Sequence, residues 1–384
     1  MAVFDECLAS FGELSYKCTI FGVAVHRKST EAVKGRGAVS NPTGRFESSG
    51  IEPHDDGWGT IDEDEAPFRT TVTPLRVKEI ITTNDSPDIG FDQSINPYNG
   101  CEHGCVYCFA RPSHEYHGLS SGLDFETKIF AKPDAPEVLR RTLAKASYKC
   151  RPIAMGTNTD PYQPIERRMG IMRGILEVLC EARHPVGIVT KSDLVLRDLD
   201  ILTEMSKRNL VRVALSVTTL DEDVARVMEP RAARPAKRLE AIRRLAAAGI
   251  PTGVMAAPMI PAINDKEMEA ILEAAAERGA TSGGYILVRL PYQLKAVFED
   301  WLRTNFPDRA DRVLSLIRQT RGGKLYDADW RVRQIGEGPY AHLLGKRFEV
   351  IAARLGLNAR NYHMDATHFR HPRRDVRQAA LFDV

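Results

Sequence analysis

The feature that most constrains the fold is a regular alternation of short apolar runs with amphipathic helical patterns. The runs have the Val, Ile, Met and Ala content that is typical of strands buried on both faces. They lie at residues 152–156, 186–190, 211–217, 252–259 and 285–290. Their spacing of roughly 30 residues indicates βαβ units and therefore a parallel sheet.

The segments between the runs repeat with a helical period. A helix is expected after Asp134, because Asp-Ala-Pro-Glu combines an N-cap residue, an early Pro and a Glu three positions on. A further strand near residues 94–98 gives about six strand–helix units. Right-handed crossovers would curl such a sheet into an open or closed barrel. We therefore predict an α/β fold, a partial (β/α)6 TIM-like barrel, with function at the carboxyl ends of its strands.

Composition divides the 384 residues into three parts. Residues 1–70 are expected to be a flexible N-terminal segment, because Gly, Ser, Pro and Asp dominate 35–64 and residues 52–65 hold acidic side chains without a Lys or Arg. Residues 71–295 should form the barrel core. Residues 296–384 should form a helical C-terminal extension and tail, with helices over 297–302, 313–317 and 341–355.

Charge and hydropathy argue against two broad classes. The formal net charge is +2, which gives no support to a general polyanion binder and leaves only a local basic patch open. No apolar run approaches the ~20 residues that span a bilayer, and the N-terminus lacks the pattern of a signal peptide. We expect a cytoplasmic protein with no membrane partner. The seven cysteines should then be thiols rather than disulfides.

Three of these cysteines share one Gly-containing loop after the first predicted strand. The sequence Asn-Pro-Tyr-Asn-Gly-Cys-Glu-His-Gly-Cys-Val-Tyr-Cys places Cys101, Cys105 and Cys108 at C-x3-C-x2-C spacing. Thiolate is a soft ligand that selects iron–sulfur clusters or zinc. Three thiols leave one metal position open, as a catalytic metal requires. A structural zinc site with His103 or His114 as fourth ligand, or three unconnected buried thiols, are the alternatives.

This motif, with an aromatic residue before the last Cys and at the first strand of a βα array, resembles the radical S-adenosylmethionine (SAM) superfamily. The resemblance covers roughly residues 90–295 and implies a partial barrel of the radical SAM type. It implies that Cys101, Cys105 and Cys108 hold a [4Fe–4S] cluster whose fourth iron binds SAM. The reduced cluster would cleave SAM to a 5′-deoxyadenosyl radical, which removes hydrogen from a substrate. A flavodoxin- or ferredoxin-type electron donor is the implied partner.

Other motifs resemble the spore photoproduct lyase-like branch of that superfamily. They are Gly-Thr-Asn-Thr-Asp-Pro from residue 156, Thr-Lys-Ser from 190, Ser-Val-Thr-Thr from 216, Glu-Pro-Arg from 229 and Pro-x-x-Arg-Leu from 235. The branch includes DNA-lesion lyases and members without an assigned substrate, so the substrate is unknown and nucleic acid is one candidate. The alternative functions are a spore photoproduct-type lyase and a zinc-stabilised nucleic-acid-binding protein.

The resemblance also implies cofactor contacts next to the cysteines and after the second strand. The ring of Tyr107 would contact the adenine, since a rigid ring can stack a base. Thr157, Asn158 and Asp160 would point into the cavity mouth, where a carboxylate suits the cationic amine of the methionine part. Turn formation before a Pro explains the same Asn and Asp residues equally well.

Further contacts are implied at the ends of the third and fourth strands. Lys191 would hold the methionine carboxylate, and Ser216 and Thr218, which share one strand face, could bond ribose or carboxylate. Arg231 is the member of the basic stretch 226–244 that stands in a turn, so it is the better functional candidate. A phosphate-bearing substrate would suit this stretch, but a solvated helix face is the simpler interpretation.

The sequence does not predict a catalytic side chain. Cys150 and Cys180 stand alone, and buried structural cysteines are the simpler interpretation, although a lyase of this branch could use a thiol to return a hydrogen atom. No phosphate-binding Gly loop follows a strand, so a nucleoside triphosphate or dinucleotide site is unsupported.

Overall fold

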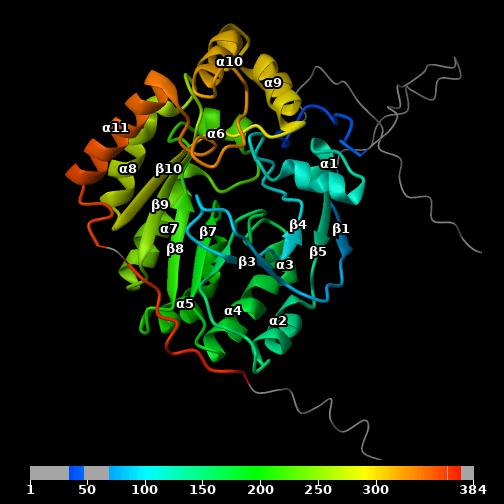
Figure 1. The fold of residues 1–384 in the computed structure, drawn as a ribbon, viewed down its shortest axis with the longest axis vertical. Helices are drawn as coiled ribbons and strands as arrows, with labels where there is room; N and C mark the ends of the chain where they lie inside the picture. Colours follow the sequence, from blue (N-terminus) through cyan, green and yellow to red (C-terminus); the bar gives the residue numbers. More distant parts are fainter. Residues whose placement is uncertain (1–33, 47–68, 361, 373–384) are drawn as a thin grey trace, which may run out of the picture.

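The computed structural model describes residues 34–46, 69–360 and 362–372. Its main sheet has seven strands: β2 (Ile81–Thr83), β3 (Gln93–Ile95), β6 (Ile153–Met155), β7 (Val186–Thr190), β8 (Val211–Ser216), β9 (Thr252–Met259) and β10 (Ser282–Leu287). Strands β3, β6, β7, β8, β9 and β10 are parallel and follow chain order, and β2 pairs antiparallel with β3 (Figure 1). The predicted α/β fold with a parallel sheet is confirmed.

A smaller sheet lies beside the start of the main one. It contains β1 (Thr71–Pro74), β4 (Tyr98–Asn99) and β5 (Lys128–Ala131), in the order β1-β5-β4. Among the described residues no pairing joins β2 to β10, so the main sheet is open. Its curling into a partial barrel stays a prediction.

Helices connect successive strands of the main sheet. The longer connecting helices are α2 (Ala135–Leu143), α4 (Ile171–Glu181), α5 (Leu199–Ser206), α7 (Pro235–Ala247) and α8 (Met268–Ala276). The shorter ones are α1 (Leu123–Thr127), α3 (Glu166–Met169) and α6 (Glu222–Met228). No helix in the described ranges is long and apolar enough to span a membrane.

Three helices follow the last strand, as predicted, and each differs in extent from the apolar pattern that indicated it. They are α9 (Leu294–Asn305), α10 (Ala310–Gln319) and α11 (Gly338–Arg354). In Figure 1, α9 and α10 lie at the top of the molecule, and α11 lies beside α8 in the outer layer. The strand predicted over 285–290 ends earlier, at Leu287, because Val288 and Leu290 pack in a second core instead.

That second core lies under the cysteine loop. Phe298 and Trp301 of α9 are buried there with Val106 and Tyr107 from the loop. The indole Nε1 of Trp301 donates to the carbonyl of Val227, 2.9 Å away, just before the end of α6. The C-terminal helices therefore support the loop directly.

Helix α2 begins where it was predicted, but Asp134 does not cap it with its side chain. Its backbone is close to helical (φ −85°, ψ 3°), whereas a capping residue adopts an extended conformation that turns the carboxylate toward the following N–H groups. The prediction was right about the position and wrong about the capping bond.

Residues 34–46 pack against the core, so the prediction of a flexible segment over 1–70 is wrong for this part. Ala38 is fully buried. The N–H groups of Gly37 and Ala38 donate to the carboxylate of Glu126, at 3.0 and 2.8 Å. Backbone groups make these bonds, which is why composition did not predict them. Apart from residues 69 and 70, the rest of the predicted segment lies outside the described residues.

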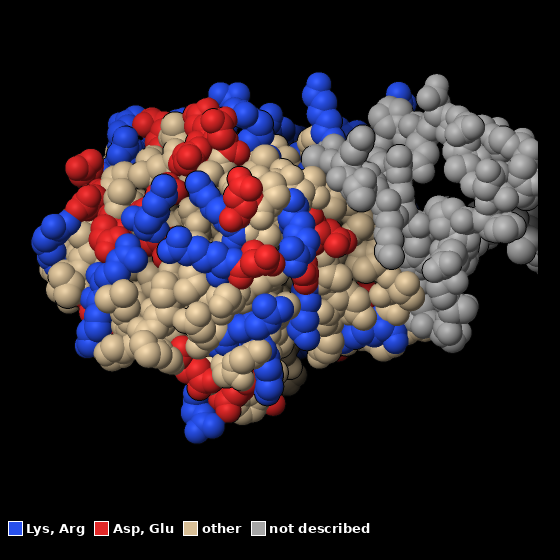
Figure 2. All heavy atoms as spheres, turned by 90° about the horizontal axis from the view of Figure 1, so that it is seen from above, with Lys and Arg blue, Asp and Glu red and all other residues tan. Residues whose placement is uncertain are grey.

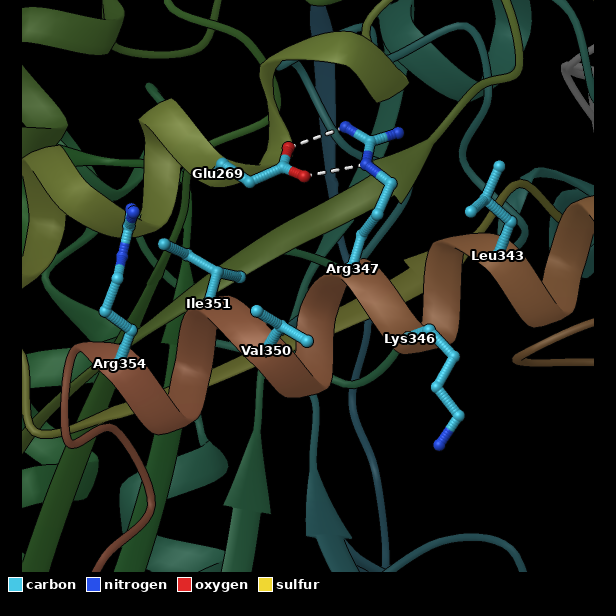
Figure 3. A pocket seen from close by; sticks show the side chains of 7 residues that line it. All are labelled: Glu269, Leu343, Lys346, Arg347, Val350, Ile351 and Arg354. Carbon is cyan, nitrogen blue, oxygen red and sulfur yellow. Dashed lines mark hydrogen bonds and ion pairs between the residues drawn. The ribbon is translucent and has the colours of Figure 1, made fainter.

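A groove of about 310 Å³ runs between α8 and α11. Figure 3 shows the guanidinium of Arg347 bonded to both carboxylate oxygens of Glu269, with Leu343 and Val350 on the same helix. The groove lies in the outer helical layer rather than at the carboxyl ends of the strands. We therefore look for the functional site elsewhere.

The close approach of residues 34–46 to the cysteine loop can be tested at Gly37. A Cβ atom there would lie 1.9 Å from the carbonyl oxygen of Gly104. We expect Gly37→Ala to lower the free energy of unfolding by about 1–3 kcal/mol, the usual cost of overpacking. Urea unfolding measures this loss. Gly90→Ala is the control, since a Cβ at Gly90 would meet nothing within 4 Å; equal stabilities of the two variants would contradict the packing.

Candidate active site

The three cysteines of the C-x3-C-x2-C motif lie between β4 and the short 3₁₀ helix Arg111–His117. Cys101 and Cys105 are 7% and 8% exposed, Cys108 is partly exposed, and all three are free thiols. Burial raises the pKa of Cys101, and the neighbouring Asp160, Cys105 and Cys108 raise it further. Cys108 packs against the buried clusters that contain Cys101 and Cys105, so the three side chains lie in one region.

A buried arginine holds the loop in shape. The Nε of Arg111 donates to the carbonyl of Cys105 at 2.9 Å, and its Nη2 donates to the carbonyl of Gly104 at 3.1 Å. Its Nη1 donates to the carbonyls of residues 121 and 122. Arg111 also pairs with Glu126, and both side chains are 0% exposed. Because all its donors are engaged, Arg111 fixes the backbone that carries the cysteines.

The other side of the loop is tied to the ends of β6 and β7. Asp160 accepts a hydrogen bond from the hydroxyl of Thr190 and another from the backbone N–H of Lys191, both at 2.7 Å. His103 Nδ1 lies 3.4 Å from the same carboxylate. Burial alone would raise the pKa of Asp160, but His103 and these hydrogen bonds lower it to about 2. Asp160 therefore joins three loops, an arrangement that favours a positioning role.

The turn after β6 is bonded to the turn after β3. The side-chain oxygen of Asn96 accepts the N–H groups of Asn158 and Thr159, at 3.1 and 3.3 Å. The amide nitrogen of Asn96 reaches the hydroxyl of Thr157 at 3.5 Å, and Thr159 donates to the carbonyl of Tyr98 at 2.7 Å. Thr157 and Asn158 are partly exposed at the strand ends, where they were expected.

A buried polar network connects Tyr107 to the end of β8. The hydroxyl of Tyr107 donates to Glu229 and lies 3.3 Å from the hydroxyl of Thr218, which also donates to Glu229 at 3.1 Å. Arg238 pairs with Glu229 at 2.6 Å. Burial would raise the pKa of Glu229, but Arg238 and Lys191 lower it. The ammonium of Lys191 lies 5.7 Å from the centre of the Tyr107 ring, so this cation stands over the ring face.

Arg238 extends the network to the last residue of β8. Its Nη1 donates to the carbonyl of Ser216 at 3.0 Å, and its Nε donates to the carbonyl of Ala233. Ser216 is 5% exposed. The structure therefore places Tyr107, Lys191, Ser216 and Thr218 around one network beside the cysteine loop.

Arg231 lies outside this network, in a cleft of about 290 Å³ beside the cysteine loop. It pairs with Glu102 at 3.1 Å, and its N–H donates to the carbonyl of His103. The basic residues of the cleft are Arg167, Arg231, Arg234 and Lys237. The basic residues of the stretch 226–244 therefore have different environments: Arg238 is buried, and the others line the cleft or face solvent. On the face seen from above, blue basic and red acidic side chains of the described residues are interspersed (Figure 2).

Four residues of this site were missed by the sequence analysis: Arg111, Glu126, Glu229 and Arg238. Glu229 and Arg238 stand in the Glu-Pro-Arg and Pro-x-x-Arg motifs, which the sequence analysis noted without assigning a role to either residue. Arg111 stands three residues after the last Cys, and Glu126 carried no signal that we can name. Cys150 lies before β6, and Cys180 lies near the C-terminus of α4. Neither cysteine therefore stands in a loop that follows a strand.

A single zinc ion needs ligand side chains that converge on one point. In the part of the chain that the structure describes, no three His, Cys, Asp or Glu side chains converge as ligands of one metal ion do. His103 faces Asp160, and His114 is buried among aromatic rings. In a [4Fe–4S] cluster each thiolate binds a different iron, so the sulfurs need not converge on one point.

Comparison with known proteins gives a family for the part of the chain that holds the cysteine loop. The family model described as the radical SAM superfamily matches residues 95–275. An uncharacterized protein of Mycobacterium tuberculosis is 36% identical over 231 residues, which is 60% of this chain and 68% of that protein. The chain belongs to the radical SAM superfamily. It is accordingly a radical SAM enzyme, and the match includes the cysteine loop and the strands from β6 to β9.

Two further likenesses are more distant. An uncharacterized protein of Methanocaldococcus jannaschii is 26% identical over 237 residues, covering 62% of this chain and 84% of that protein. The solved structure of a spore photoproduct lyase mutant aligns with a TM-score of 0.51 and 16% identity, over 74% of this chain and 80% of that one. The second likeness shows a shared fold.

The buried ion pair under the cysteine loop can be tested by removing one partner. We expect Arg111→Met to lower the free energy of unfolding by about 3–5 kcal/mol, because Glu126 would remain as an uncompensated buried charge. Urea unfolding under anaerobic conditions measures the loss. Arg140→Met is the control, since Arg140 pairs with Glu181 at an exposed site and should cost at most about 1 kcal/mol. Similar losses in both variants would contradict the assigned role.

Proposed function

We propose that Cys101, Cys105 and Cys108 hold a [4Fe–4S] cluster, and that the enzyme binds SAM beside it to remove a hydrogen atom from a substrate. The donor set supports this: three free thiols gather in one loop whose backbone is fixed by Arg111. Thiolates are the usual ligands of iron–sulfur clusters. When bound, the cluster supplies the electron for reductive cleavage of the SAM sulfonium.

The polar network beside the loop is the proposed SAM site. Tyr107 presents a ring face and Lys191 a cation next to it, which suit the adenine and the methionine carboxylate respectively. Ser216 at the end of β8 and the partly exposed Thr157 and Asn158 after β6 offer further hydrogen-bonding groups.

Three other predicted contacts have a different part in this proposal. The hydroxyl of Thr218 is engaged with Glu229, and Asp160 is engaged with His103, Thr190 and Lys191. We infer that Thr218 and Asp160 position the binding groups instead of serving as the main ligands. Arg231, in the separate basic cleft, is proposed to face substrate or an electron donor of the flavodoxin or ferredoxin type.

The DNA-lesion lyase alternative requires more than the fold likeness. If such a lyase returns a hydrogen atom from a protein thiol, that thiol must lie near the mouth of the site. Cys150 and Cys180 do not stand in loops that follow strands. We therefore propose a radical SAM enzyme whose substrate is unassigned, and we keep the lyase as the alternative.

The single observation that carries this proposal is the fixed three-thiol loop, and iron analysis tests it. Protein purified without oxygen should contain about four irons per chain, and SAM should change the electron paramagnetic resonance spectrum of the reduced form. Cys101→Ala, Cys105→Ala and Cys108→Ala should each lose most of the iron. Cys150→Ala and Cys180→Ala are matched controls that should keep it. Zinc in place of iron, or equal loss in the controls, would contradict the proposal.

The role of Lys191 can be tested separately from the cluster. We expect Lys191→Ala to weaken SAM binding about tenfold, because a charge-assisted bond to the methionine carboxylate is lost. Calorimetry on the iron-loaded protein measures the change. Lys207→Ala removes an exposed lysine that pairs with Glu204 and should bind SAM like the unmodified protein. Unchanged affinity in the Lys191 variant, with iron retained, would remove Lys191 from the site.

A further inference from the structure

The turn after β10 carries an arginine whose charged group forms no ion pair with the described residues. Arg289 lies two residues beyond β10, at the carboxyl ends of the parallel strands. Among the described residues, no hydrogen bond or ion pair holds its guanidinium, and its Nε is buried without a partner. Its Cζ lies 4.6 Å from the ring centre of Phe109, which directly follows Cys108. An unpaired cation thus stands beside the cysteine loop.

A second arginine adds positive charge at the same place. Arg321 is fully buried, and its Nη2 donates to the carbonyl of Val288, 3.1 Å away, next to Arg289. Within the described ranges no carboxylate forms an ion pair with either arginine. Burial and then the charge of Arg289 lower the pKa of Arg321 to about 10. An anion bound to Arg289 would compensate a charge that pairs with no carboxylate of the described residues.

Exposed aromatic rings surround the same turn. Five aromatic side chains of the described residues are large and exposed, and four of them, Phe46, Phe109, Tyr116 and Tyr292, belong to this region. We call these four the aromatic rim. Arg45 joins three of them: its Cζ lies 3.9 Å from the ring centre of Tyr292, 5.1 Å from that of Phe46 and 5.7 Å from that of Tyr116.

The rim and the unpaired arginine form one surface. Tyr292 follows Arg289 by three residues, so the short turn between β10 and α9 touches Phe109 at one end and Arg45 at the other. Rings exposed at 42–73% keep apolar faces in water, which is unfavourable unless a flat ligand covers them. Aromatic faces next to arginines are the combination that stacks bases and binds phosphates.

We propose that this surface binds a nucleotide unit of the substrate, with its phosphate on Arg289 and its base on the aromatic rim. The inference rests on the proposed function, because it takes the mouth beside the cysteine loop as the place where substrate enters. The guanidinium of Arg289 makes no hydrogen bond to the described residues, so Arg289→Gln gives up only the contact with the Phe109 ring and should leave the fold intact.

The test is binding of a labelled single strand of ten thymidine nucleotides to iron-loaded, SAM-saturated enzyme, measured by fluorescence anisotropy. SAM saturation keeps nucleotides out of the cofactor site. We expect Arg289→Gln to weaken binding about tenfold and to lower the salt slope by about 0.7, the contribution of one phosphate on a single strand. Tyr292→Ala should also weaken binding about tenfold, as loss of a stacking ring does.

Arg354→Gln is the matched control, since it removes an exposed arginine on α11, in the outer layer, and should leave binding unchanged. Iron content shows that each variant is intact. Unchanged binding in the Arg289 variant, or an equal loss in the control, would overturn the inference.

Competition by thymidine monophosphate distinguishes the source of the nucleotide. If thymidine monophosphate binds as tightly as the strand, and this binding depends on Arg289, the ligand is a free nucleotide. If the strand binds much more tightly than the monophosphate, the ligand is a single-stranded nucleic acid. Either result supports the site. If the enzyme does not cleave SAM but still binds the nucleotide in a way that depends on Arg289, the proposed function is contradicted and this inference stands.

Discussion

The buried pair of Arg111 and Glu126 is the interaction on which the site depends. Arg111 holds the carbonyls of Gly104 and Cys105, and Glu126 receives the N–H groups of Gly37 and Ala38. One ion pair thus joins the cysteine loop, α1 and the N-terminal residues that the structure describes. A buried pair of this kind is costly to desolvate, and its hydrogen bonds to fixed backbone groups offset that cost while defining one loop geometry.

The groups around the cysteine loop fall into two sets with different chemistry. In the first set Tyr107, Thr218, Glu229 and Arg238 form a buried network whose charges are paired. Arg289 belongs to the second set, because it lies against the Phe109 ring and forms no ion pair with the described residues. Charged groups that are already paired within the protein hold neighbouring side chains in place and bind a further ligand poorly. A cation without such a pair can bind an anionic ligand. This difference is why we assign Thr218, Glu229 and Arg238 to positioning of the cofactor site, leave the Tyr107 ring as the adenine contact, and assign Arg289 to substrate.

The sequence pattern correctly predicted those features of the fold that depend on residues close together along the chain. The spacing of Cys101, Cys105 and Cys108 predicted their common loop, and the apolar runs predicted the parallel strands. The pairing of Arg111 with Glu126 could not be predicted, because it depends on how a 3₁₀ helix and α1 meet in space. The same holds for residues 34–46, whose backbone groups bind a carboxylate that lies far along the chain.

The apolar run at 285–290 shows why extent is harder to predict than position. Val288 and Leu290 are as apolar as strand residues, but they are buried by α9 and the cysteine loop in the second core. Likewise, Asp134 has the chemistry of a cap without the backbone conformation of one. In each case tertiary packing decides what the local sequence leaves open.

The central claim is that three thiolates hold a cluster with one iron left free of protein ligands. Anomalous diffraction at the iron edge, from crystals grown without oxygen, measures this most directly. The account predicts iron density against the sulfurs of Cys101, Cys105 and Cys108, and one iron that no protein atom binds. A single zinc ion, or a fourth side chain on the remaining iron, would contradict it.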